Sequence, residues 1–151
     1  MTSLRVTTGS QAETEELGRR LGRYLKERVK TGTVLLFGDL GAGKTTLIRG
    51  IASAFGIPER DIGSASFVIV ADYETDPPFY HIDLYRVETE EDLDSLGIWE
   101  YIGTEGISVI EWSERLPEHP EDSIRVSIQY KEEDSREITL EGINEEDWGH
   151  M

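Results

Sequence analysis

The sequence predicts a single α/β domain built on a central, mixed β-sheet with helices on its faces. Predicted strands and helices alternate in the first half of the chain, and strands dominate in the second half. The length of 151 residues suits one domain with a core of its own. We expect this domain to span residues 1–143, followed by a flexible C-terminal tail over residues 144–151. The order of the strands in the sheet does not follow from the sequence.

Local patterns predict the first two elements. Residues 4–8 form a short β-like segment, and Ser10 with Glu13 forms a capping box that starts a helix. This helix ends near residues 31–32, and apolar side chains at helical spacing are expected to line one of its faces: Ala12, Leu17, Leu21, Leu25 and Val29. The apolar run TVLLF at residues 33–37 is then typical of a buried strand.

The rest of the chain is predicted to hold two more helices and several strands. After a glycine-rich turn, a helix runs from residue 44 to about 55, and Thr89 caps a short helix that continues to Leu96. Five further runs have the composition or alternation of strands: residues 67–73, 79–85, 107–112, 124–130 and 136–141. A polar turn at residues 131–135 joins the last two strands into a hairpin.

Residues 38–45, GDLGAGKT, fit the phosphate-loop pattern G-x-x-x-x-G-K-[ST] at every fixed position. Glycines allow a tight turn whose backbone amides face phosphate oxygens, and the following helix points its positive dipole end at them. We expect Lys44 to reach the β- and γ-phosphates, Thr45 to hold Mg²⁺ and Thr46 to approach the α-phosphate. The other loop residues expected at the phosphates are Asp39, Leu40, Gly41, Ala42 and Gly43.

The surroundings of this motif are those that a phosphate loop requires. A buried strand is predicted before it and a helix after it, whereas the competing dinucleotide-binding pattern G-x-G-x-x-G does not occur. The predicted class is therefore a single-domain P-loop NTPase, with a nucleotide bound at the end of the strand 33–37.

Two carboxylates at strand ends are candidates to complete the site. Hydrolysis or transfer needs a further magnesium contact and a group that orients the nucleophile. Asp83 ends the run FYHID, and Glu111 ends the run ISVIE. Glu111 is the stronger candidate because an apolar strand closes directly on the acid. For each of them, the alternative is a plain surface carboxylate at a strand end.

Several other residues have two interpretations. The serine loop at residues 64–66 is a γ-phosphate switch or, as the residues alone favour, an ordinary turn. His81 is more typical of a half-buried structural histidine than of a catalyst. Trp112 fits a contact with the nucleotide or a place in the core. Arg86 and Arg136 fit a contact with phosphate or nucleobase, or a pair with a neighbouring carboxylate.

Charge and composition exclude several function classes. Residues 1–87 hold 11 basic and 11 acidic residues, whereas residues 88–151 hold 4 and 20, so the second part carries the whole net charge of −16. An acidic surface repels a phosphate backbone, so tight direct binding of nucleic acid is not expected. The second part is a solvated face or a docking surface for a basic partner.

Other absences in the sequence narrow the chemistry and the location. The chain has no cysteine, which excludes disulfides, a cysteine nucleophile and thiolate metal sites. No apolar run has the length of a signal peptide or a membrane span, so we expect a cytoplasmic protein without membrane association.

Together these motifs resemble those of the TsaE (YjeE/YdiB) family of small bacterial P-loop ATPases. The resemblance runs from about Gln11 to Arg136 and rests on TEELG at 14–18, GDLGAGKTT at 38–46, HIDLYR at 81–86, LGI at 96–98 and VIEW at 109–112. The H-x-D-L-Y-R and V-x-E-W segments, in this order in so short a chain, make it specific. One departure is Ser64-Ala65-Ser66, where the family usually has Ser-Pro-Thr.

The resemblance implies roles for individual residues. Thr45 and Glu111 would ligate Mg²⁺, and Asp83 would lie beside the metal and the γ-phosphate and position water. Segments around Thr14 and Arg136 would flank the adenine. With a γ-phosphate-sensing role for the serine loop, the implied catalytic set is Lys44, Ser66, Asp83 and Glu111.

The resemblance also implies cofactors, partners and a function. The cofactors would be ATP or ADP and Mg²⁺. The family acts in forming the threonylcarbamoyl modification of the adenosine next to the anticodon in tRNA. Its ATPase works with TsaB and with TsaD, which carries the transferase site, and is thought to reset their complex by ATP turnover. Contact with tRNA would then be indirect, through the complex.

Three alternatives compete with this function. A small-molecule kinase usually closes an arginine-bearing lid over the phosphates, and no lid-like cluster occurs after residue 87. A GTPase switch would carry an N/T-K-x-D segment, which the chain lacks. A nucleotide-dependent binding module with negligible turnover remains open, because isolated switch ATPases often turn over slowly until a partner completes the site.

Overall fold

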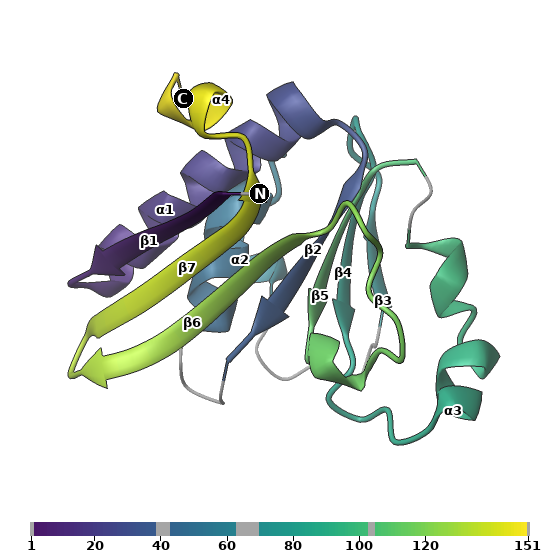
Figure 1. The fold of residues 1–151 in the computed structure, drawn as a ribbon. Helices are drawn as coiled ribbons and strands as arrows, with labels where there is room; N and C mark the ends of the chain where they lie inside the picture. The colour runs from purple at the N-terminus through teal and green to yellow at the C-terminus, as the bar shows by residue number, and fades with distance from the viewer. Residues whose placement is uncertain (1, 39–42, 63–69, 103–104, 151) are drawn as a thin grey trace.

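The computed structural model describes residues 2–38, 43–62, 70–102 and 105–150, and these form one seven-stranded sheet flanked by helices (Figure 1). The strands lie in the order β1-β7-β6-β2-β5-β4-β3. Their bounds are β1 (Thr2–Thr8), β2 (Gly32–Phe37), β3 (Val70–Tyr73), β4 (Phe79–Asp83), β5 (Ile107–Glu111), β6 (Ile124–Glu132) and β7 (Ser135–Ile143).

The sheet is mixed, as the sequence predicts. Strands β6, β2, β5 and β4 run parallel to one another, whereas β7 and β1 at one edge and β3 at the other pair antiparallel. All five residues of β5 are buried, which agrees with its mostly apolar sequence, because central parallel strands are covered on both faces. The predicted hairpin is confirmed as β6 and β7.

Helices cover the two faces of the sheet unequally. Their bounds are α1 (Gln11–Tyr24), η1 (Leu25–Val29), α2 (Lys44–Ser53), η2 (Glu59–Asp61), α3 (Glu90–Ser95), η3 (Ile98–Glu100), η4 (Ser113–Arg115) and α4 (Glu145–Gly149). One apolar cluster joins α1 and α2 to the face that presents Val34 and Leu36, and a smaller cluster joins α3 and η3 to the face that presents Leu35. Because successive side chains of a strand point to opposite faces of the sheet, β2 contributes to both apolar clusters.

Helices α1 and α2 pack with their backbones unusually close. A Cβ on Gly50 would lie 2.1 Å from the carbonyl oxygen of Glu15, and a Cβ on Gly18 would lie 2.3 Å from that of Leu47. Ala12, expected on the buried face of α1, is exposed instead. The expectation fails because glycines form part of the buried stripe, and an apolar periodicity does not detect them.

Two predicted boundaries shift. The first helix ends as an α-helix at Tyr24 and continues as the π-helical turn η1, after which Lys30 takes a φ of 67°. The strand expected over residues 79–85 ends at Asp83. Of the strand expected over residues 67–73, positions 67–69 lie outside the described residues, and β3 covers the remainder.

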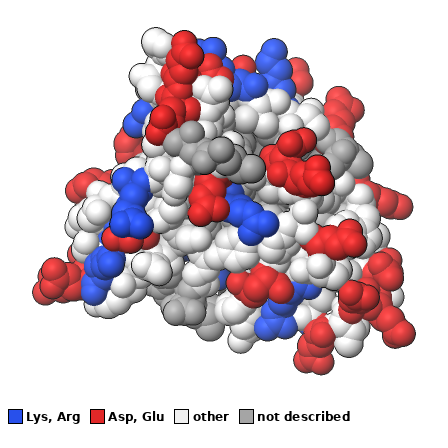
Figure 2. All heavy atoms as spheres, viewed as in Figure 1, with Lys and Arg blue, Asp and Glu red and all other residues white. Residues whose placement is uncertain are grey.

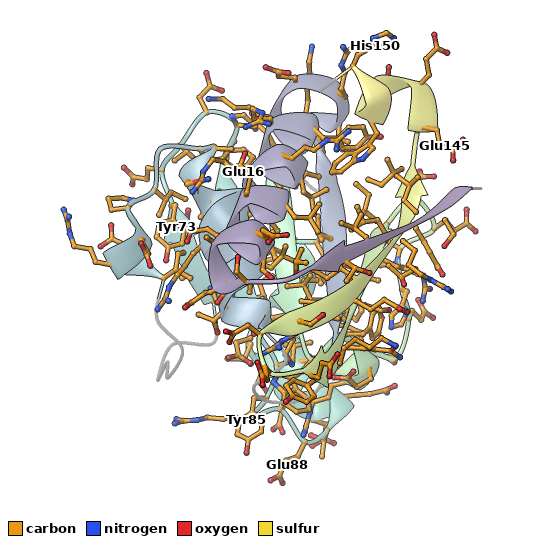
Figure 3. The ribbon with its side chains drawn as sticks, turned by 90° about the vertical axis from the view of Figure 1, so that its left-hand side faces the viewer. Glu16, Tyr73, Tyr85, Glu88, Glu145 and His150 are labelled. Atoms are coloured by element: carbon orange, nitrogen blue, oxygen red, sulfur yellow. The ribbon has the colours of Figure 1, made fainter. Side chains whose placement is uncertain are left out.

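The segment expected to be a loose tail forms helix α4. Asn144 caps it by accepting a hydrogen bond from the Asp147 amide at 3.0 Å, and the Trp148 side chain is buried. The Trp148 ring packs edge-on against Tyr24 at 5.9 Å and lies 4.1 Å from the Arg20 guanidinium. Figure 3 shows α4 beside the end of α1, with His150 at the outer tip. The sequence missed this helix because five residues are too few for a periodic signal.

Within the described ranges, no helix is both long and apolar enough to cross a membrane.

Candidate functional site

The predicted site lies where the parallel strands β2, β5 and β4 end and where helix α2 begins (Figure 1). Gly43 caps α2 with a φ of 106°, a conformation that suits glycine, and Lys44 is the first helical residue. Six residues from the predicted phosphate and serine loops lie outside the described part of the chain: Asp39, Leu40, Gly41, Ala42, Ser64 and Ser66.

Lys44 is the most unusual side chain of the site. It is only 5% exposed, and its Nζ has no hydrogen-bond partner among the described residues. The ammonium lies 4.1 Å from the centre of the Trp112 ring, a cation–π contact. A buried ammonium without an acceptor is costly, so this position favours a negatively charged ligand. Phosphate oxygens at the N-terminus of α2 fit that need.

Asp83 and Glu111 meet at the same sheet edge. They are paired residues at the ends of the neighbouring parallel strands β4 and β5. Their side chains follow the alternation of Phe79 and Val109, which pack in the cluster with α2, so both acids project on the α2 side of the sheet. Glu111 is buried, and Asp83 is partly exposed and accepts a hydrogen bond from the Tyr85 amide at 3.0 Å.

His81 also belongs to this group. Its Nε2 lies 2.7 Å from Oε2 of Glu111, and both side chains are buried. The structure thus agrees with a histidine that has a hydrogen-bond partner, but the sequence did not indicate that the partner is the candidate magnesium ligand. The sequence did hold one relevant signal. His81 and Asp83 are two residues apart on one predicted strand, so their side chains point to the same face of the sheet, on which the candidate metal ligands lie.

Trp112 covers the site from the end of β5. It takes a φ of 59°, which is uncommon for a bulky residue and turns the chain directly after Glu111. Its ring lies over Lys44 and also 5.1 Å from the ring of Tyr85, which is about half exposed. Arg115 approaches the outer side of this pair, 5.6 Å from the Trp112 ring. Tyr85 and Glu88 mark this end of the molecule in Figure 3.

The start of α1 lies against the start of α2. Gln11 Nε2 donates to the Thr46 hydroxyl at 3.5 Å, which places the first turn of α1 next to the phosphate-loop helix. Thr14, however, is buried and shares a hydrogen bond of 2.7 Å with the Thr8 hydroxyl. Thr45 and Thr46 are partly exposed. Thr14 therefore supports the start of α1, with its hydroxyl already engaged.

Arg136 reaches the site from the β6–β7 hairpin. Its Nε lies 3.7 Å from the position that a Cβ on Gly43 would take. The guanidinium donates to the carbonyl oxygens of Glu133 and Ser135, at 2.9 and 3.0 Å, and lies over the Tyr130 ring. The structure therefore brings Arg136 next to the phosphate loop, whereas Arg86 is exposed beyond the end of β4.

The donor set suits magnesium held together with phosphate. Among the described residues, no group of three or more His, Asp or Glu side chains is arranged to hold a metal by itself. Mg²⁺ is commonly bound through one or two protein oxygens, with phosphates and waters completing the octahedron. Thr45, Asp83 and Glu111 at one edge match that mode, and a protein-only metal cage does not.

Acidic side chains gather away from this edge. Figure 2 shows them along the right-hand side of the face, where α3 lies in Figure 1. A groove of about 300 Å³ opens there, lined by Glu90, Leu93, Asp94, Trp99, Pro117 and Glu118. The Trp99 side chain is 40% exposed. None of the three groove carboxylates forms an ion pair within the described ranges.

The strand–loop–helix order and the placement of Lys44, Asp83 and Glu111 at one sheet edge define the fold of a P-loop NTPase. A family model described as "Threonylcarbamoyl adenosine biosynthesis protein TsaE" matches residues 8–138. The chain belongs to the TsaE family, as the sequence motifs predict.

Individual relatives agree with this assignment. The chain is 44% identical over 130 residues to a tRNA threonylcarbamoyladenosine biosynthesis protein TsaE from Nostoc sp., covering 82% of this chain and 79% of the relative. It is 35% identical over 146 residues to the Bacillus subtilis TsaE, covering 95% and 88%. The crystal structure of B. subtilis YdiB superposes with a TM-score of 0.67 at 29% identity and covers 92% of this chain and 84% of that one.

Proposed function

We propose that this protein binds ATP with Mg²⁺ at the edge formed by β2, β4, β5 and α2 and hydrolyses it. The observation that carries the proposal is the Lys44 ammonium, which is buried at the start of α2 without a hydrogen-bond acceptor among the described residues. A polyphosphate would supply that acceptor and would also lie at the positive end of the α2 dipole.

Each residue of the site has a distinct task in this mechanism. Lys44 binds the β- and γ-phosphates, and Thr45 and Glu111 hold the metal, which when bound neutralises phosphate charge. Asp83, beside Glu111 on the next strand, orients the attacking water. Arg136, close to Gly43, adds positive charge at the mouth of the loop. Ser66 is proposed to sense the γ-phosphate, as the family resemblance implies.

ATP turnover is proposed to serve tRNA modification through partner proteins. The relatives are named for the biosynthesis of threonylcarbamoyladenosine in tRNA. We infer that this chain acts in the same process by binding a TsaB–TsaD complex and resetting it between cycles. The net charge of −16 disfavours unaided tRNA binding, so tRNA would be contacted through the complex.

The first experiment is calorimetric titration of ATP into wild type and Lys44→Ala. Loss of the phosphate counter-ion should weaken binding at least 100-fold, because a charge-assisted contact to phosphate is removed. Equal affinity of the two proteins would refute the phosphate-loop assignment.

The second experiment measures ATP hydrolysis by the protein alone and with TsaB–TsaD, with and without tRNA. Stimulation by the partners supports a reset ATPase, whereas turnover indifferent to them refutes that role and calls for a screen of phosphate acceptors.

A further inference from the structure

The contact between His81 and Glu111 joins two neighbouring strands inside the site. His81 lies on β4 and Glu111 ends β5, and the Nε2 to Oε2 distance is 2.7 Å. The two side chains are 8% and 7% exposed, so water competes little for this hydrogen bond. Phe79 and Val109, which precede them on the same face, are fully buried and leave the strand ends little freedom to shift.

The chemistry of the two groups determines the direction of the hydrogen bond. A carboxylate has no proton to give, so the imidazole Nε2–H donates and Oε2 accepts. A glutamate side chain has three rotatable bonds, and this one bond removes most of that freedom. Oε2 is then engaged by the ring, and Oε1 is left as the oxygen that can face a metal or its water.

We infer that His81 is a positioning residue that holds the Glu111 carboxylate in the orientation needed for Mg²⁺. The inference rests on the proposed function and adds to it a specific residue that acts through Glu111. Carboxylates that ligate metals are themselves commonly hydrogen-bonded, and removing such an outer partner typically costs 10- to 100-fold in metal affinity or activity. A purely structural pair would instead affect stability and leave the metal requirement unchanged.

The test measures binding of a non-hydrolysable ATP analogue as a function of Mg²⁺ concentration. Two substitutions separate hydrogen bonding from volume: His81→Met fills the space without a donor, and His81→Gln retains an N–H donor at the end of its chain. We expect His81→Met to raise the Mg²⁺ concentration for half-maximal tightening about 10- to 100-fold. Binding without metal should stay within about twofold of wild type, and His81→Gln should recover most of the loss.

A matched control separates this effect from general destabilisation. The Ser123 hydroxyl is buried and donates to the Pro120 carbonyl at 2.6 Å, in a segment that contributes nothing to the site. Ser123→Ala should lower the thermal midpoint and leave the Mg²⁺ dependence unchanged. If His81→Met behaves like Ser123→Ala, or if metal-free binding falls as much as metal-dependent binding, the inference is overturned.

Two further measurements keep the outcome decisive. If His81→Met does not fold, NMR of the ring nitrogens in metal-free wild type at one fixed pH replaces it: a proton on Nε2 supports the inference, and an unprotonated Nε2 overturns it. The Lys44→Ala titration tests the proposed function separately. If wild type binds the analogue and Lys44→Ala does not, an unchanged Mg²⁺ dependence in His81→Met refutes the inference about His81 and leaves the proposed function standing.

Discussion

Replacing Gly50 with alanine adds one methyl group and should push apart helices α1 and α2, whose N-terminal ends form part of the candidate site. The new Cβ would lie 2.1 Å from the Glu15 carbonyl oxygen, about 1.3 Å short of the 3.4 Å at which ordinary contact begins. Both atoms are held by helical backbone, so neither side chain flexibility nor a rotamer change relieves the clash. Helix α1 must therefore move away from α2.

The expected magnitude is the balance of two effects. Overpacking a tight interface costs about 1–3 kcal/mol or more, whereas alanine in place of a helical glycine returns about 1 kcal/mol. Because the added Cβ meets backbone atoms, we expect a cost at the upper end of this range and so a net loss of about 2 kcal/mol, which lowers the thermal midpoint of a chain of this size by about 4–8 °C. Because Gln11 of α1 contacts Thr46 of α2, separation of the helices should also weaken ATP binding.

The assay is thermal and urea unfolding followed by circular dichroism, with Gly149→Ala as the control. Gly149 lies in α4 with nothing within 4 Å of the added Cβ, so that substitution should be neutral or slightly stabilising. If Gly50→Ala is as stable as wild type, or if both variants change stability equally, the close α1–α2 approach does not limit this fold.

Three other predictions follow from the packing, the charges and the groove. Trp148→Ala should cost about 3–5 kcal/mol in unfolding free energy, because a buried ring between Tyr24 and Arg20 is lost; a change under 1 kcal/mol would mean that α4 is not integral to the domain. The pKa of Asp92 is lowered because its carboxylate accepts hydrogen bonds from the Glu88 and Thr89 amides at the cap of α3. Its contribution to stability is therefore present above the ordinary pKa of 3.8 and is lost as the pH falls through the lower value in the folded protein. Asp92→Ala should accordingly destabilise the protein most at pH 7 and progressively less as the pH is lowered below 3.8 in urea unfolding, and an effect that stays the same at every pH would contradict the capping role. Charge reversal of Glu90, Asp94 and Glu118 in the groove should slow association with TsaB–TsaD at low salt about tenfold or more if the acidic side is a docking surface. Unchanged association would leave it a solvated face.

Local signals in the sequence predicted much of the fold. The apolar run before residue 38, the Ser10 cap of α1, and the hairpin of β6 and β7 are each confirmed close to their predicted bounds. The predicted capping box forms only in its serine half, because the Glu13 carboxylate accepts a hydrogen bond from the Gly9 amide instead of the Ser10 amide. Their causes act over a few residues: alternation, a cap, a turn. The misses have a common cause, because Ala12, the π-helical turn and α4 depend on which neighbours the chain meets in space.

In the candidate site, too, the sequence indicated individual residues but not the contacts between them. The sequence indicated Lys44 from a spacing pattern and indicated Asp83 and Glu111 as acids at strand ends, and the structure brings these three to one edge. It did not indicate that Trp112 lies over Lys44 or that His81 holds Glu111. The first contact depends on the parallel pairing of β2 with β5, and the second on that of β4 with β5, and no local pattern encodes either pairing.

The sequence by itself determined the class of fold and the family, and it indicated the candidate site residues, because a phosphate loop is a contiguous motif that can be recognised from residue spacing alone. The tertiary structure decided the strand order, the glycine-mediated contact of α1 with α2, the anchoring of Trp148 and the partners of Lys44 and Glu111. Each of these joins segments distant along the chain, and their energies arise from burial and close contact, which exist only after the chain has folded.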